Sequence, residues 1–122
     1  MKKEIFNKFY HYLNQVVVGT EFEGHVFLSG ECVREFLQGK SEISKIDITV
    51  DIENGGLEFA KWLTQTEDCY VKDKNPVNIV SNQRAYFKIT TNEDFKNIFV
   101  CCMQTRLNPS YSAVDGSSNF GS

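Results

Sequence analysis

The sequence lacks several features that would assign it to a functional class at once. It has no apolar run long enough for a signal peptide or a membrane helix, so we expect a cytoplasmic protein without membrane contact. It has no run of lysines and arginines, and its formal net charge is −3. Nucleic-acid binding therefore has little compositional support.

The four cysteines and two histidines form no recognisable metal or disulfide pattern. The cysteines stand at positions 32, 69, 101 and 102, without Cys-x-x-Cys spacing, and the histidines are far apart. We therefore expect reduced, mostly buried thiols rather than a zinc site or a secreted disulfide framework. Cys32 has two interpretations: a thiolate stabilised at an expected helix start, or a buried apolar filler.

What is present indicates one α+β domain. The 122 residues are 41% hydrophobic and 24% charged, which suffices for a single core. Apolar periodicity predicts helices at 3–18 and 57–66, with a short helix between two strands near 26 and 46. Further strands are predicted at 69–71, 77–80, 85–89 and 98–102. We expect a mixed sheet over residues 1–107, flanked by two to three helices, and a flexible Ser/Gly-rich tail over 108–122.

The stretch from His25 to Asp51 is the most informative part of the chain. An apolar strand runs into the turn Ser29-Gly30, a short helix follows and stops at Gly39, and the chain returns as a strand around Asp47. Backbone N–H groups at such a turn and helix start bind anions, and a neighbouring strand carboxylate binds a divalent cation. The pattern predicts a phosphate-and-metal site.

The same stretch carries a family resemblance. Its run is Gly30-Glu31-Cys32-Val33-Arg34-Glu35, then Phe36-Leu37-Gln38-Gly39, then Lys45-Ile46-Asp47-Ile48-Thr49-Val50. It resembles the head domain of the CCA-adding enzyme and poly(A) polymerase family of nucleotidyltransferases, whose pattern is Gly-Gly-x-Val-Arg-Asp, Leu-Leu-Gly and Asp-x-Asp. The likeness covers residues 25–63 and implies a nucleotidyltransferase-like sheet.

The resemblance also implies roles for individual residues. Ser29, Gly30 and Arg34 would bind the triphosphate, and Asp47, with Asp51 as a further candidate, would hold Mg²⁺. The chain departs from the family pattern at three places: Glu31 replaces the second glycine, Glu35 replaces the Asp of Val-Arg-Asp, and the first Asp of Asp-x-Asp is either replaced by Lys45 or deleted. Two-metal phosphoryl transfer needs paired carboxylates, so these changes bear directly on activity.

Each of these residues also has a purely structural interpretation. Gly30 suits any tight strand-to-helix turn. Asp47 can pair with Lys45 on the strand surface, and Arg34 can pair with Glu31, three residues earlier on the same helix, or with Glu35.

Three functional hypotheses remain open at this point. The first is a degenerate nucleotidyltransferase-like domain that binds a nucleoside triphosphate or a protein partner without catalysis. The second is an active Mg²⁺-dependent enzyme in which Asp51, Glu35 or Asp94 replaces the missing carboxylate. The third is an excised or truncated head domain of a larger protein, which the Ser/Gly-rich tail permits. The missing Asp, Glu31 and the missing base-selecting neck of the family favour the domain without catalysis.

Overall fold

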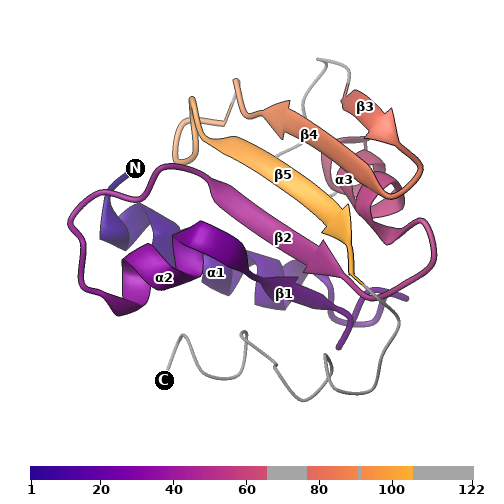
Figure 1. Ribbon diagram of the computed structural model, residues 1–122, viewed down its shortest axis with the longest axis horizontal. Coiled ribbons are helices and arrows are strands. Elements are labelled where there is room, and N and C mark those ends of the chain that lie inside the picture. The colour runs from indigo at the N-terminus through magenta and orange to yellow at the C-terminus, as the bar shows by residue number, and fades with distance from the viewer. Residues whose placement is uncertain (66–76, 91, 106–122) are drawn as a thin grey trace.

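The computed structural model describes residues 1–65, 77–90 and 92–105 (Figure 1). Within these ranges, three helices accompany a mixed five-stranded sheet. The helices are α1 (Lys3–Val16), α2 (Gly30–Leu37) and α3 (Gly55–Gln65). The strands are β1 (Val26–Leu28), β2 (Ile46–Val50), β3 (Asn78–Ser81), β4 (Arg84–Lys88) and β5 (Phe99–Gln104). The predicted α+β class, with its mixed sheet and flanking helices, is confirmed.

The strands lie in the order β1-β2-β5-β4-β3. β1 is antiparallel to β2, with Phe27 opposite Thr49, which confirms that the strands near 26 and 46 are neighbours. β4 is antiparallel to both β3 and β5, as the short connections predicted. β2 and β5 are parallel, with Asp47 opposite Cys101. The sequence did not predict this last pairing, which joins the two halves of the sheet.

One face of the sheet carries the hydrophobic core. In β2 the alternate residues Ile46, Ile48 and Val50 are at most 1% exposed, and α1 places Phe6 and Phe9 in the same core. α3 packs on β5 and β4. In Figure 1, α1 and α3 lie behind the sheet. The period of two along β2 therefore separates buried residues from a second set that points away from the core.

The opposite face of the sheet, the outer face, is formed by alternate residues of β2, β5 and β4. Its members are Asp47 and Thr49 from β2, Phe99, Cys101 and Met103 from β5, and Arg84, Tyr86 and Lys88 from β4. Its exposure is uneven: Cys101 is 8% exposed, whereas Phe99 and Met103 are 41% and 43% exposed. Arg84 and Lys88 of β4 are exposed, whereas Thr49 of β2 is 9% exposed, so the face is more exposed at β4 than at β2.

Two helix limits differ from the predicted ones. α1 ends at Val16 rather than at residue 18, a difference within the usual fraying of a last turn. α3 begins at Gly55 rather than at residue 57. Asn54 adopts a positive φ of 60°, so the turn is completed earlier and both glycines enter the helix. The glycines therefore lie in the part of α3 that meets the sheet.

Some predictions fall outside the described residues. The strand at 69–71, with its predicted buried thiol Cys69, and the tail at 108–122 lie there, and they stay predictions. In the described ranges, no helix has the length and apolar character needed to cross a bilayer.

Candidate functional site

The turn between β1 and α2 brings the helix start against β2. The Ser29 N–H donates to the Asp47 carbonyl at 2.9 Å, and this bond ends the pairing of β1 with β2. Gly30 then takes a φ of +70° and opens α2. A Cβ atom at Gly30 would stand 3.1 Å from Oδ2 of Asp47. The helix start and the strand carboxylate therefore face each other at contact distance.

Three more side chains complete a cluster, the turn site, which consists of Ser29, Gly30, Lys45, Asp47 and Thr49. The Ser29 hydroxyl does not cap α2; it is hydrogen-bonded to the hydroxyl of Thr49. Lys45 Nζ lies 3.5 Å from Asp47 Oδ1, with the two side chains 42% and 20% exposed. The Lys45–Asp47 ion pair, which is the purely structural interpretation of Asp47, is therefore present. Thr49 was not singled out by sequence, although it lies two residues from Asp47 on the same face.

The site does not fit Mg²⁺ as it stands. Mg²⁺ takes near-octahedral oxygen ligands that usually include one or two carboxylates. The only carboxylate of the turn site is Asp47, and an ammonium is already paired with it. Across residues 1–65, 77–90 and 92–105, no group of three or more His, Cys, Asp and Glu side chains is placed to hold a metal ion.

Asp51, the second predicted metal ligand, lies away from Asp47. It follows β2, and four residues of strand separate the two by about 13 Å. Its Oδ1 lies 2.7 Å from Nδ1 of His25, so the carboxylate is engaged at the far end of the strand. The structure therefore does not bring the two predicted metal ligands together.

The other two substitute carboxylates are also engaged elsewhere. Glu35 Oε1 accepts hydrogen bonds from the backbone N–H and the hydroxyl of Ser44, at 3.3 and 3.1 Å. Asp94 pairs with Lys8 Nζ of α1 at 3.1 Å. Neither contact involves a member of the turn site.

Arg34 lies on the exposed surface of α2, one turn beyond Gly30. In the described part of the chain it forms no ion pair, so its expected pairing with Glu31 or Glu35 is absent there. Its guanidinium is held by no described side chain beside the turn. Of the residues predicted to bind phosphate, the structure brings Ser29 and Gly30 to Asp47 and leaves Arg34 at the periphery.

Cys32 is the buried filler, not a reactive thiolate. The side chain is fully buried; its thiol donates to the Ser29 carbonyl at 3.1 Å, and its sulfur accepts the Asp47 N–H at 3.4 Å. Burial, followed by the nearby Asp47 charge, raises the pKa of the thiol from 9.0 to about 11. Cys101 and Cys102 are buried free thiols as well. Cys32 therefore links the start of α2 to β2 and fixes the backbone of Asp47.

The raised pKa of Cys32 predicts a loss of stability at alkaline pH. Below pH 9 the thiol is protonated in both states; above it the unfolded chain ionises while the folded thiol stays protonated up to about pH 11. The free energy of unfolding should therefore fall with pH in this window, by about 2 kcal/mol at pH 10.5. Denaturant unfolding of the native chain and of Cys32→Ala at pH 8 and 10.5 measures this, because the variant lacks the contribution. Equal losses in both proteins would contradict it.

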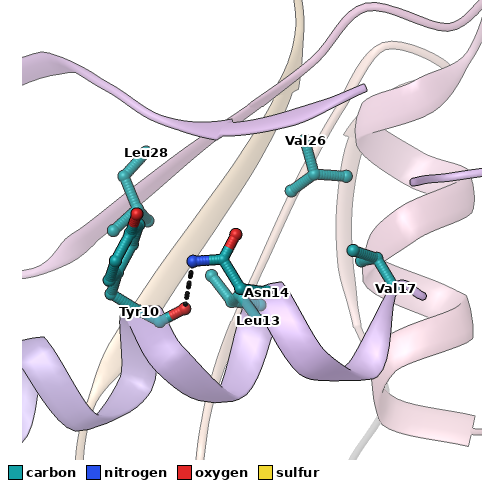
Figure 2. A pocket seen from close by; sticks show the side chains of 6 residues that line it. All are labelled: Tyr10, Leu13, Asn14, Val17, Val26 and Leu28. Atoms are coloured by element: carbon teal, nitrogen blue, oxygen red, sulfur yellow. Dashed lines mark hydrogen bonds between the residues drawn. The ribbon is translucent and has the colours of Figure 1, made fainter. Parts of the chain in front are cut away.

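A small pocket between α1 and β1 is not a ligand site. Figure 2 shows the Asn14 amide between Tyr10 and Val26, with Nδ2 donating to the Tyr10 carbonyl at 3.3 Å. The cavity holds about 20 Å³, which is room for one water molecule. Its lining consists of Tyr10, Leu13, Asn14, Val17, Val26 and Leu28. It is a packing feature of α1 against the sheet.

Comparisons with protein-family models, curated proteins and solved structures return no match. The turn site is thus known from its own geometry. It joins a helix start, two hydroxyls, one ammonium and one carboxylate within a single strand–turn–helix–strand unit.

Proposed function

We propose that this chain is a nucleotidyltransferase-like domain that binds the phosphate groups of a nucleoside triphosphate without transferring the nucleotide. One observation carries the proposal: Gly30 opens α2 with a positive φ, facing the carboxylate of Asp47, while Lys45 holds the other oxygen of that carboxylate. The start of a helix and a lysine ammonium therefore lie on either side of one carboxylate.

The backbone at the turn is suited to a phosphate. Gly30 has no side chain to obstruct the first turn of α2, and the charge that opposes an anion there is the Asp47 carboxylate, 3.1 Å from where a Cβ would stand. The N–H groups of this turn have no partner within the helix and carry the positive end of its dipole. The hydroxyls of Ser29 and Thr49 bond to each other, which leaves one O–H group to donate at the same place. Glu31 opposes anion binding by its charge, but its side chain is exposed and water screens it.

Lys45 supplies the positive charge that a divalent cation supplies in a metal-dependent site. Its ammonium is held near the turn by Asp47 at 3.5 Å. A surface ion pair of this kind is worth at most about 1 kcal/mol. A phosphate can therefore draw Lys45 away from Asp47 at small cost, since hydrogen bonds to fully charged groups contribute about 1.5–3 kcal/mol.

Transfer of the nucleotide needs more than this site offers. Two metal ions must activate the attacking hydroxyl and steady the leaving pyrophosphate, and paired carboxylates must clamp them. Asp47 is the only carboxylate of the turn site, and Asp51, Glu35 and Asp94 have other partners. The residues support binding and leave the two-metal step without its ligands.

Calorimetric titration with ATP, in EDTA and separately in excess Mg²⁺, tests the proposal. We expect the native chain to bind in EDTA, with no gain on adding Mg²⁺. Lys45→Ala should weaken binding about tenfold or more, because a charged donor to phosphate is lost. Lys40→Ala is the matched control: Lys40 is an exposed lysine that follows α2 at its far end, and its loss should leave affinity unchanged.

Two results would contradict the proposal. The first is an absence of ATP binding by the folded native chain at millimolar concentration. The second is Mg²⁺-dependent incorporation of labelled nucleotide into an RNA primer that disappears in Asp47→Ala. That result would restore the active enzyme as the leading hypothesis.

A further inference from the structure

The outer face carries an exposed aromatic pair beyond the turn site. Tyr86 of β4 and Phe99 of β5 stack with ring centroids 5.4 Å apart and planes 22° from parallel. Phe99 is 41% exposed, whereas the core phenylalanine Phe95 is 1% exposed. The pair therefore presents ring surface to solvent and lies apart from the core.

Strand register places this pair next to the turn site. Cys101 of β5 lies opposite both Asp47 of β2 and Tyr86 of β4. Neighbouring strands are about 4.8 Å apart, so Asp47 and Tyr86 are separated by about 10 Å across the outer face. Phe99 precedes Cys101 by two residues and shares its face, at the end of β5 that lies beside the start of β2, which Lys45 immediately precedes. One nucleotide can bridge this distance.

The charges around the aromatic pair suit a phosphate-bearing ligand. Lys88 lies opposite Phe99, and Arg84 precedes Tyr86 by two residues on the same face of β4. Both side chains are exposed and form no ion pair with any described residue. With Lys45, three cations border the aromatic surface, and Asp47 is the only carboxylate of the outer face.

We infer that Tyr86 and Phe99 form a stacking platform for the base of a nucleotide whose phosphates occupy the turn site. This inference rests on the proposed function and adds a second contact between the protein and the nucleotide, at the base. Stacking on an aromatic face is available to every base, because each base has a π surface. The platform therefore binds purines more strongly than pyrimidines by ring area, but it does not read their hydrogen-bonding edges.

Affinities for inorganic triphosphate, CTP and ATP, measured by calorimetry in EDTA, separate the two contacts. We expect ATP to bind about tenfold more tightly than inorganic triphosphate, with CTP between them. Phe99→Ala should remove the difference between ATP and triphosphate and leave triphosphate affinity unchanged. Phe99→Trp should keep the difference, because it preserves an aromatic face.

Met103→Ala is the matched control, since Met103 is 43% exposed on the same strand and face and lies two residues beyond Cys101, on the other side of Tyr86 from Phe99. It should bind every ligand as the native chain does. If Phe99→Ala fails to fold, as judged by circular dichroism, Phe99→Leu keeps the side-chain volume and removes the aromatic face. Phe99→Leu should likewise remove the difference in affinity between ATP and triphosphate.

The outcomes distinguish this inference from the proposed function. If triphosphate binds but ATP binds no more tightly, the platform is wrong and the phosphate site stands. The same holds if Phe99→Ala weakens triphosphate and ATP equally. If neither ligand binds, the proposed function fails and the platform fails with it. Binding of a single-stranded oligonucleotide in the absence of any mononucleotide binding would also overturn the inference.

Discussion

Replacing Gly56 by alanine is expected to destabilise the domain by about 3 kcal/mol or more, the largest effect expected for such a change at any glycine in the described residues. Alanine ordinarily stabilises a helix relative to glycine by about 0.5–1 kcal/mol, so helix propensity alone predicts the opposite sign. A Cβ atom at Gly56 would overlap the carbonyl oxygen of Gln83 and stand 2.9 Å from that of Cys102. Both neighbours are backbone, so no side chain can rotate away.

The cost follows from what has to move. The Gln83 carbonyl accepts the Gln104 N–H at 2.7 Å and belongs to the turn between β3 and β4. Relieving the overlap shifts α3 off β4 and β5 or breaks this bond, and overpacking of this kind costs about 1–3 kcal/mol or more. Subtracted from a typical total stability of about 5–15 kcal/mol, this loss leaves the variant folded at 25 °C with a clearly lower denaturation midpoint.

Denaturant unfolding followed by circular dichroism measures this effect, with Gly39→Ala as the control. Gly39 has a positive φ of 74° and open space around it. Its replacement therefore costs only backbone strain, about 1–2 kcal/mol. Equal stability of the two variants would mean that α3 does not approach the sheet as closely as the structure shows.

The elements of this fold follow from local pattern. Alternation of Ile46, Ile48 and Val50 predicts β2, and the glycine stop at Gly39 predicts the end of the short helix. The Ser29-Gly30 turn and the Lys45 to Asp47 ion pair were also predictable, because their members are close in sequence or on one face of one strand. These features depend on neighbours within a few residues.

Long-range pairing was not predictable in the same way. The parallel contact of β2 with β5 places Cys101 beside Asp47, across more than fifty residues of chain. No local periodicity specifies which strand follows β2 in a sheet, since pairing register depends on burial of the whole face. The stacking of Tyr86 on Phe99 and the close approach of Gly56 to Gln83 depend on that pairing. The candidate base platform therefore became visible only in three dimensions.

The double variant Glu31→Gly with Lys45→Asp is expected to change how the turn site binds nucleotide. Lys45→Asp removes the ammonium that lies 3.5 Å from Asp47 and places a second carboxylate two residues away on the same strand face. Glu31→Gly removes a negative charge from the first turn of α2. The site then has the paired carboxylates that Mg²⁺ takes and loses its own cation.

We therefore expect ATP binding by the double variant to require Mg²⁺. ATP binding by the double variant should be undetectable in EDTA, because two unscreened carboxylates repel the phosphates. Mg²⁺ should restore binding by tenfold or more, about 1.4 kcal/mol at least. Calorimetry of the native chain and the double variant, each in EDTA and in Mg²⁺, gives the comparison. The single variant Glu31→Gly is the control, and it should bind ATP more tightly than the native chain without needing metal.

Comparing the double variant with Glu31→Gly shows whether Lys45 contacts the phosphates. If the folded double variant binds ATP equally with and without Mg²⁺, then Lys45 and Asp47 do not touch the phosphates. The turn would then be architectural, and the exposed apolar surface of the outer face, with Phe99 and Met103, would favour a protein partner. If Mg²⁺ dependence appears in the double variant and not in Glu31→Gly, the lysine just before β2 accounts for the difference between a metal site and a metal-free phosphate site in this backbone.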